Sequence, residues 1–292
     1  MKLSPTFLQR LEALPSLFRF RYSAYLRKDG KRKNKYRFGH GTEFSQHRKY
    51  NPGDDIRYID WNLYARSQSF YIKSFSTEES QPVYILADIS KSMDFGSPVK
   101  FDFAISLSAG LSLLSLRSLD RVSVYLWDTS IRRNLINLRG TLAFPKVINF
   151  LESAVSSRNA TDLEATCREF LNTKVIPGPI WIISDFYDAL AFEHALSLLC
   201  NHRFIPLPIR VLNRHETSFN HSGHYTLIDS ETGDFQRFLS TKSNKRKFAA
   251  QFERLTSQLR EISHTHNVIL REVMTDHPAD DFLIGLLKDY QL

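Results

Sequence analysis

Asp88, Ser90 and Ser92 stand directly after a short apolar run at residues 83–87. In an extended backbone alternate residues face the same side, so one carboxylate and two hydroxyls would point together. Oxygen atoms of this kind suit Mg²⁺, which prefers octahedral oxygen coordination and often retains water. The same residue types are also common in turns and at helix starts. Taken alone, the motif therefore favours turn and cap residues over a metal site.

Two further stretches supply one hydroxyl and one carboxylate. Thr161 lies in a polar turn that leads into a helical pattern, and Asp185 ends a second apolar run typical of a buried strand. Open α/β sheets bind ligands beyond the carboxyl ends of their parallel strands. With these two residues the oxygen set is complete in the order Asp-x-Ser-x-Ser, Thr, Asp. The set predicts a Mg²⁺ or Mn²⁺ site at one edge of a sheet.

The elements that must position these side chains alternate between strand and helix from residue 83 to residue 212. This alternation predicts an α/β fold with a parallel sheet and helices on both faces. Strands are expected near 83–88, 121–128, 133–138, 180–185 and 204–211. Helices are expected near 98–118, 142–157, 162–173 and 189–200. Pro206 and Pro208 indicate an edge or irregular strand at 204–211, because proline cannot donate to a ladder.

Three regions are expected along the chain. Residues 1–80 hold a helix over 3–17, a basic run and a β-rich stretch, with a strand at 70–75, laid against the main domain. Residues 81–212 form the main α/β domain with the metal site. Residues 213–292 form an extension packed on the core, with a hairpin near 224–234, a strand at 268–273 and a short helix at 280–290. An apolar stripe at helical spacing predicts a core-facing helix; its members are Phe248, Phe252, Leu255, Leu259 and Ile262.

The five oxygen-bearing residues resemble the metal-ion-dependent adhesion site of von Willebrand factor A domains. An earlier stretch resembles the signature of the DUF58 family, a group of von Willebrand A-like proteins. The signature residues, which could also form a partner surface, are Arg48, Tyr50, Gly53, Asp54, Arg57, Asp60, Trp61 and Arg66. Residues 227–233 resemble the family's C-terminal part, so the resemblance covers nearly the whole chain.

This resemblance implies an open, mostly parallel von Willebrand A-like sheet, with an antiparallel edge strand at 133–138 and a β-rich N-terminal insert region. It implies that Asp88, Ser90, Ser92, Thr161 and Asp185 are metal ligands. It also implies a MoxR-type AAA+ ATPase as partner and a chaperone-like role in maturing a client protein complex.

The signature region has two interpretations. In the first, its residues are structural: Trp61 is an apolar anchor, and Arg57 is a bidentate donor to a carboxylate. In the second, a partner protein recognises these side chains. The pattern favours the structural interpretation slightly, and leaves the second open.

The positive charge is concentrated near the N-terminus. The chain has a net charge of +8, and residues 1–50 contain 13 Lys and Arg against 3 Asp and Glu. Its densest part consists of Arg27, Lys28, Lys31, Arg32, Lys33, Lys35 and Arg37. A solvated loop is the favoured interpretation. Peripheral contact with anionic lipid, or docking of an acidic partner, is the alternative. Nucleic acid ranks low, because no recognition motif or aromatic stacking pattern accompanies the run.

The two cysteines and the hydropathy of the chain indicate in which cellular compartment the protein is expected. Cys167 and Cys200 both fall in helical patterns and are expected to be reduced core thiols. No apolar run approaches the length of a membrane span, and no signal-peptide pattern precedes the first helix. We therefore expect a soluble cytoplasmic protein.

The preferred function is a non-catalytic binding module in which the metal ion links this chain to a carboxylate of its partner. The P-loop, His-Glu-x-x-His and Gly-x-Ser-x-Gly motifs do not occur in the sequence, and no nucleophile or base is evident. A metal-dependent hydrolase acting on phosphoesters remains an alternative, because a metal site can support that chemistry. A binder of anionic surfaces, acting through the basic run, is a second alternative.

Overall fold

The computed structural model describes residues 3–13, 43–51, 54–76, 80–217, 224–228, 235–239 and 241–290. Its contacts divide the chain into two compact units. One unit contains α1 (Pro5–Ala13) and every element from residue 81 onward. The other contains the short elements between residues 43 and 76. Each unit is described by itself.

A six-stranded sheet forms the centre of the larger unit, in the order β10–β7–β6–β3–β4–β5. Its strands are β3 (Pro82–Asp88), β4 (Arg121–Trp127), β5 (Ile131–Leu138), β6 (Pro179–Ser184), β7 (Ile205–Leu212) and β10 (Arg271–Met274). All neighbouring pairs are parallel except β4 and β5, which are antiparallel. The predicted von Willebrand A-like α/β sheet, including its antiparallel edge strand, is confirmed.

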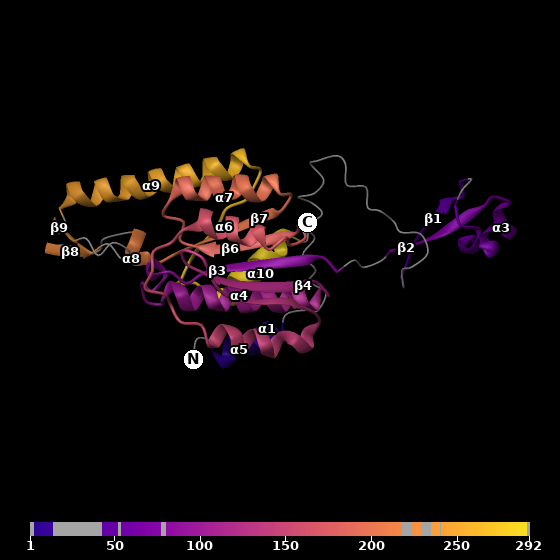
Figure 1. The fold of residues 1–292 in the computed structure, drawn as a ribbon, viewed down its shortest axis with the longest axis horizontal. Helices are drawn as coiled ribbons and strands as arrows, with labels where there is room; N and C mark the ends of the chain where they lie inside the picture. The colour runs from indigo at the N-terminus through magenta and orange to yellow at the C-terminus, as the bar shows by residue number, and fades with distance from the viewer. Residues whose placement is uncertain are drawn as a thin grey trace. The chain divides into compact units, whose positions relative to one another are not determined.

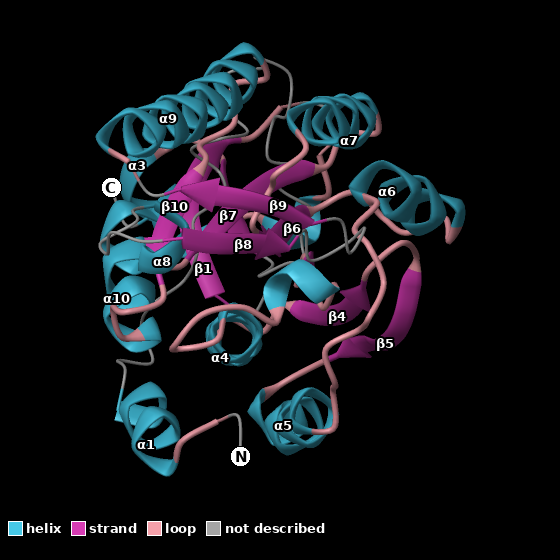
Figure 2. Ribbon diagram, turned by 90° about the vertical axis from the view of Figure 1, so that its left-hand side faces the viewer, coloured by secondary structure: helices cyan, strands magenta, loops and turns pink. Residues whose placement is uncertain are grey.

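Helices cover both faces of this sheet (Figures 1 and 2). On one face lie α4 (Lys100–Arg117) and α5 (Phe144–Glu152), with α1 and α10 (Ala279–Tyr290) beside α4. On the other lie α6 (Leu163–Asn172), α7 (Ala189–Asn201) and α9 (Lys242–Thr265). Covering both faces explains why β6 is buried along its whole length and apolar up to Ile183.

The side chains on the second face form a core rich in aromatic rings. Phe170 of α6 makes edge contacts with Tyr84 and Tyr125, at centroid distances of 5.1 and 5.3 Å. Leu259, one of the predicted apolar stripe residues of α9, is fully buried in the same cluster. The predicted core-facing helix is confirmed.

The prediction that 204–211 is an edge or irregular strand is wrong, because β7 pairs with β6 on one side and with β10 on the other. The N–H of Ile205 points toward β6, where it donates to Gly178 O at 3.1 Å. By strand alternation, the nitrogens of Pro206 and Pro208 face the opposite side. The pairing with β10 begins only at Ile209. Neither proline therefore interrupts a ladder.

The C-terminal part of the chain adds one strand to the main sheet and forms a separate hairpin. The strand predicted at 268–273 is present as β10, which forms the sheet edge next to β7. The predicted hairpin is present as β8 (His224–Ile228) and β9 (Phe235–Leu239), which pair antiparallel. A four-residue helix, α8 (Arg214–Thr217), follows β7. The turn between β8 and β9 lies outside the described residues.

The smaller unit contains an antiparallel pair, β1 (Glu43–Lys49) and β2 (Tyr71–Ser76). Between them lie the 3-10 helix η2 (Ile56–Tyr58) and the helix α3 (Trp61–Ser67). The strand predicted at 70–75 is confirmed, whereas α3 interrupts the expected β-structure. Asp60 accounts for this helix, because its carboxylate accepts the N–H groups of Asn62 and Leu63 as an N-cap.

Candidate functional site

Two carboxylates reach the same edge of the main sheet from neighbouring strands. Asp88 is the last residue of β3, and Asp185 directly follows β6. The two strands are parallel, with Ala87 opposite Ile183, so both end at one edge. Asp88 is fully buried and Asp185 is 2% exposed. This edge is where open α/β sheets bind ligands.

Asp88, Ser90 and Ser92 form one hydrogen-bonded cluster. The backbone N–H of Ser90 donates to Oδ1 of Asp88 at 2.8 Å, and the Ser184 hydroxyl donates to Oδ2 at 2.6 Å. The hydroxyl oxygens of Ser90 and Ser92 lie 3.1 Å apart. A 3-10 helix, η3 (Lys91–Met93), begins directly after Ser90. A tight turn, rather than an extended backbone, thus brings the two hydroxyls together.

The charge of Asp88 is unfavourable in this environment. Burial raises the pKa of Asp88, the negative charge of Asp185 raises it further, and the result is about 7. The hydrogen bonds from Ser184 and Ser90 act in the opposite direction but are outweighed. A cation at this edge would relieve the repulsion between the two carboxylates.

Asp128 organises the loop that carries Thr161. Its buried carboxylate accepts hydrogen bonds from the Ser157 hydroxyl at 2.6 Å, Asn159 Nδ2 at 2.8 Å and Arg132 Nε at 2.6 Å. Burial acts to raise the pKa of Asp128, but these hydrogen bonds lower it to about 2. Asp128 is not among the predicted residues, although it directly follows the buried strand β4, just as Asp185 directly follows β6.

The loop tethered by Asp128 lies against the turn that follows β3. The N–H of Ser157 donates to Ile89 O at 2.6 Å, and the N–H of Lys91 donates to Asn159 O at 3.0 Å. The loop leads through Thr161 into α6. Segments that carry all five predicted ligand residues are therefore brought to one edge of the sheet.

Lys100, the first residue of α4, supplies a buried positive charge that the sequence patterns do not predict. Its ammonium donates to Asp185 Oδ2 at 2.8 Å and to Glu216 Oε1 at 2.5 Å. Lys100 is fully buried. Burial acts to lower the pKa of Lys100, but the two carboxylates raise it above its ordinary value. The sequence shows only that a lysine stands at the start of a long apolar helix. This does not reveal which carboxylates the lysine contacts.

The donor set fits a hard divalent cation. Asp88 with the Ser90 and Ser92 hydroxyls provides oxygens within one cluster, and Asp185 adds a second carboxylate nearby. Within the described residues, no group of three or more His, Cys, Asp or Glu side chains could hold a metal ion. The predicted site is of a different kind, because three of its five ligands are hydroxyls. It stays a prediction, with Lys100 already paired to one of its carboxylates.

The signature residues have mixed positions. Asp60 is 8% exposed and its Oδ2 lies 2.9 Å from Nε2 of His47, which ties α3 to β1. Arg57 makes the expected bidentate contact, but its carboxylate partner is the adjacent Asp55, and the pair is exposed. Trp61 is 60% exposed, so its side chain does not serve as a buried anchor.

The remaining signature residues that the structure describes make local contacts or are exposed. The N–H of Tyr50 donates to Phe70 O at 2.9 Å, and Asp54 accepts from the N–H of Asn51 at 2.8 Å. Arg48 lies in β1 and Arg66 is exposed on α3. Gly53 and the basic run from Arg27 to Arg37 lie outside the described residues.

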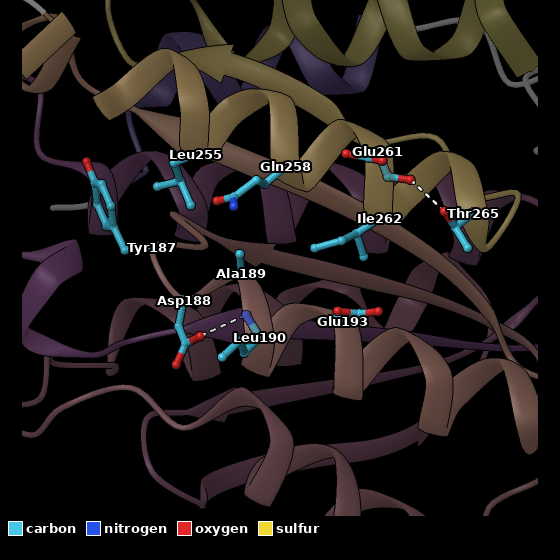
Figure 3. Close-up of a pocket in the computed structure, with 10 residues that line it drawn as sticks. All are labelled: Tyr187, Asp188, Ala189, Leu190, Glu193, Leu255, Gln258, Glu261, Ile262 and Thr265. Atoms are coloured by element: carbon cyan, nitrogen blue, oxygen red, sulfur yellow. Dashed lines mark hydrogen bonds between the residues drawn. The ribbon is translucent and has the colours of Figure 1, made fainter. Parts of the chain in front are cut away.

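A groove of about 730 Å³ lies between α7 and α9 (Figure 3). Leu190 and Glu193 line it from α7, and Leu255 and Ile262 line it from α9. None of the five predicted ligands lines this groove, but Tyr187 at one end follows Asp185 by two residues. The groove is therefore a neighbour of the candidate site and not a part of it.

None of the helices in the described part of the chain combines the length and the apolar character that crossing a bilayer needs.

The fold defines the class as a von Willebrand A-like α/β domain. Oxygen-bearing side chains, Asp88 and Asp185 among them, stand where β3 and β6 end. The family described as "Protein of unknown function DUF58" matches residues 46–262. The chain belongs to this family.

Curated relatives carry the description "uncharacterized protein". Proteins of Mycobacterium tuberculosis and Mycobacterium bovis are 22% identical over 204 residues, which cover 68% of this chain and 64% of the relative. The chain thus spans just under two thirds of the length of these relatives.

Several solved structures are similar in part. An aerotolerance-related membrane protein from Bacteroides fragilis matches with a TM-score of 0.44 and 16% identity, over 72% of this chain and 98% of the other. The conserved hypothetical protein BatB from Bacteroides thetaiotaomicron matches with a TM-score of 0.39 and 15% identity, over 71% and 98%. The manganese-loaded TRAP protein of Plasmodium vivax matches with a TM-score of 0.36 and 18% identity, over 46% and 57%.

Proposed function

We propose that this protein is a protein–protein interaction module that docks a partner through a divalent cation at the carboxyl edge of its sheet. Asp88, Ser90 and Ser92 hold the ion, with Thr161 and Asp185 contributing directly or through water. The ion supplies a coordination position for a carboxylate of the partner. Mg²⁺ is the expected ion, with Mn²⁺ as an alternative.

The observation that carries this proposal is the cluster around Asp88. A fully buried carboxylate lies beside two hydroxyl oxygens that are 3.1 Å apart, and a second buried carboxylate raises its pKa. Such an arrangement is costly unless cations offset its charge, and Lys100, which pairs with Asp185, offsets that of one of the two carboxylates. Its oxygen atoms are the ligands that Mg²⁺ prefers.

Binding is supported better than hydrolysis by the engagement of the two carboxylates. Both oxygens of Asp88 accept hydrogen bonds, and Oδ2 of Asp185 accepts from the ammonium of Lys100. These contacts fix the orientation of both carboxylates, as the ligands of an ion require, and the sequence offers no evident nucleophile or base to act with them.

The proposed partner is a MoxR-type AAA+ ATPase, acting with this chain in the maturation of a client complex. The family resemblance of the sequence suggests this partner. A carboxylate on the ATPase would complete the coordination of the ion.

The experiment is a titration of the candidate ATPase by biolayer interferometry, in Mg²⁺ and in EDTA. We expect binding in Mg²⁺ and a loss of about tenfold or more in EDTA and in Asp88→Ala, since a shared ion is removed in both. Asp94→Ala is the matched control, because Asp94 is an exposed carboxylate near the same turn. Equal affinity under all of these conditions would contradict an ion bridge.

A further inference from the structure

The ammonium of Lys100 is held at the candidate site by two charge-assisted hydrogen bonds. It lies 2.8 Å from Asp185 Oδ2 and 2.5 Å from Glu216 Oε1, and its side chain has no exposed surface. The rings of Tyr187 and Phe95 flank it, with centroids 5.3 and 5.9 Å from Nζ. Two carboxylates and two aromatic faces thus surround one buried charge.

The partners of Lys100 are themselves fixed by the fold. Glu216 Oε2 accepts from the N–H of Asn213 at 2.9 Å, so the carboxylate bridges the ammonium and the backbone at the end of β7. The side chain of Asn213 donates to Pro98 O at 3.1 Å, in the segment that leads into α4. The ammonium therefore has little freedom to leave Asp185.

Charge balance at the edge depends on this lysine. Asp185 and Glu216 both contact Lys100, and the charge of Asp185 acts on Asp88. Lys100 offsets one of these three negative charges. A divalent ion that uses Asp185 must share it with Lys100. Without the lysine, the same ion would meet a site more negative by one charge.

We propose that Lys100 is a resident cation of the site: it neutralises Asp185, lowers the affinity of the site for divalent cations, and makes folding independent of the ion. This inference rests on the proposed metal site and adds a residue that sets its affinity. Lys100 is a positioning residue, because it acts on the ion through Asp185.

The test measures Mg²⁺ binding alone, without any partner protein. Isothermal titration with MgCl₂ and thermal unfolding in Mg²⁺ or EDTA are compared for wild type, Lys100→Met and the double variant Lys100→Met/Glu216→Gln. The double variant removes one positive and one negative charge, so it preserves the net charge, and we expect it to fold even where the single variant does not. Lys146→Met is the control, because Lys146 is exposed on α5.

The expected result is Mg²⁺ affinity higher by about tenfold in Lys100→Met than in wild type, and higher by less in the double variant, which frees Asp185 but keeps the charge of the site. Both variants should unfold at a lower temperature in EDTA and recover when Mg²⁺ is added, because ligand binding stabilises the native state. Wild type and Lys146→Met should change little between the two conditions. A purely structural lysine would lower the unfolding temperature equally in Mg²⁺ and EDTA.

Two results would overturn the inference. One would exclude only the role of Lys100, and the other would also exclude the metal site. Equal, measurable Mg²⁺ affinity in wild type and both Lys100 variants would leave the metal site standing and exclude the role of Lys100. No detectable Mg²⁺ binding in any of these proteins would exclude the metal site, and the proposed function with it.

Discussion

At the scale of single residues, Asp88 is buried beside another carboxylate, and its charge depends on pH and on nearby cations. Its pKa of about 7 lies well above that of an aspartate in an unfolded chain. Between about pH 4 and pH 7 the folded protein therefore binds more protons than the unfolded protein. Without a divalent cation, this group makes the protein less stable as the pH rises through that interval.

Replacing Asp88 by Asn should therefore stabilise the protein at pH 8 in EDTA. The amide keeps an acceptor for the Ser90 N–H and removes the repulsion from Asp185. We expect a gain of roughly 1–3 kcal/mol in the free energy of unfolding, measured by urea denaturation. The gain should vanish near pH 4, where wild-type Asp88 is protonated. A loss of stability at pH 8 would show that the repulsion is already compensated.

The pKa of Asp128 predicts the opposite pH dependence. Its folded pKa of about 2 is below the unfolded value near 4, so its stabilisation is present above about pH 4 and is lost as the pH falls toward 2. Asp128→Asn should cost on the order of 1–2 kcal/mol at pH 7 and progressively less below pH 4. Urea denaturation at several pH values measures this difference. If the stability lost in Asp128→Asn were the same at every pH, the charge of Asp128 would not be what stabilises the folded protein.

At the scale of elements, the segment between β3 and α4 determines where Lys100 enters its helix. Gly96 in this segment has a φ of +93°, and a Cβ there would lie 2.3 Å from Nδ2 of the buried Asn213. A side chain would therefore meet both an unfavourable backbone conformation and a fixed neighbour. Asn213 in turn contacts Pro98 and Thr275, so this segment links α4 to β7 and the end of β10.

Gly96→Ala should be more destabilising than Gly140→Ala. Both glycines have positive φ, but nothing lies within 4 Å of a Cβ at Gly140, so that variant reports the backbone cost alone. We expect about 1 kcal/mol for Gly140→Ala and roughly 2–4 kcal/mol for Gly96→Ala. Thermal unfolding of both variants gives the comparison. Equal losses would mean that Asn213 moves aside at little cost.

At the scale of the whole molecule, the two cysteines report on global unfolding of the larger unit. Both are free thiols, and Cys167 belongs to the buried core between the sheet and α6. Burial raises the pKa of Cys167 to about 12, and the charges of Asp162 and Glu164 act in the same direction. A neutral, inaccessible thiol is a poor nucleophile.

We expect Cys167 to react with a thiol reagent such as DTNB only when the protein unfolds. In Cys200→Ala the single remaining thiol should label slowly under native conditions and fully in guanidinium chloride. The labelling rate should increase with denaturant as the globally open population increases. Rapid labelling of this variant in native buffer would contradict the core position of Cys167. Reductant should leave the unfolding temperature of wild type unchanged.

The sequence by itself determined the alternation of strands and helices, the identity of the helix stripe on α9, and the edge at which Asp88 and Asp185 meet. These features follow from local patterns: continuous apolar runs predict strands covered on both faces, and parallel strands end together. The antiparallel edge strand came from the family resemblance, and β4 and β5 confirm it.

Only the tertiary structure decided which charges meet. Lys100 lies 85 residues from Asp185 and 116 from Glu216 along the chain, and no local pattern relates residues so distant. Likewise, two prolines are tolerated in the interior strand β7 because β10 begins to pair only beyond them. Secondary structure depends on the spacing of neighbouring residues, whereas ion pairs and strand order depend on how distant segments pack. For this reason the common edge at which β3 and β6 end was predictable from the sequence, and the buried lysine beside it was not.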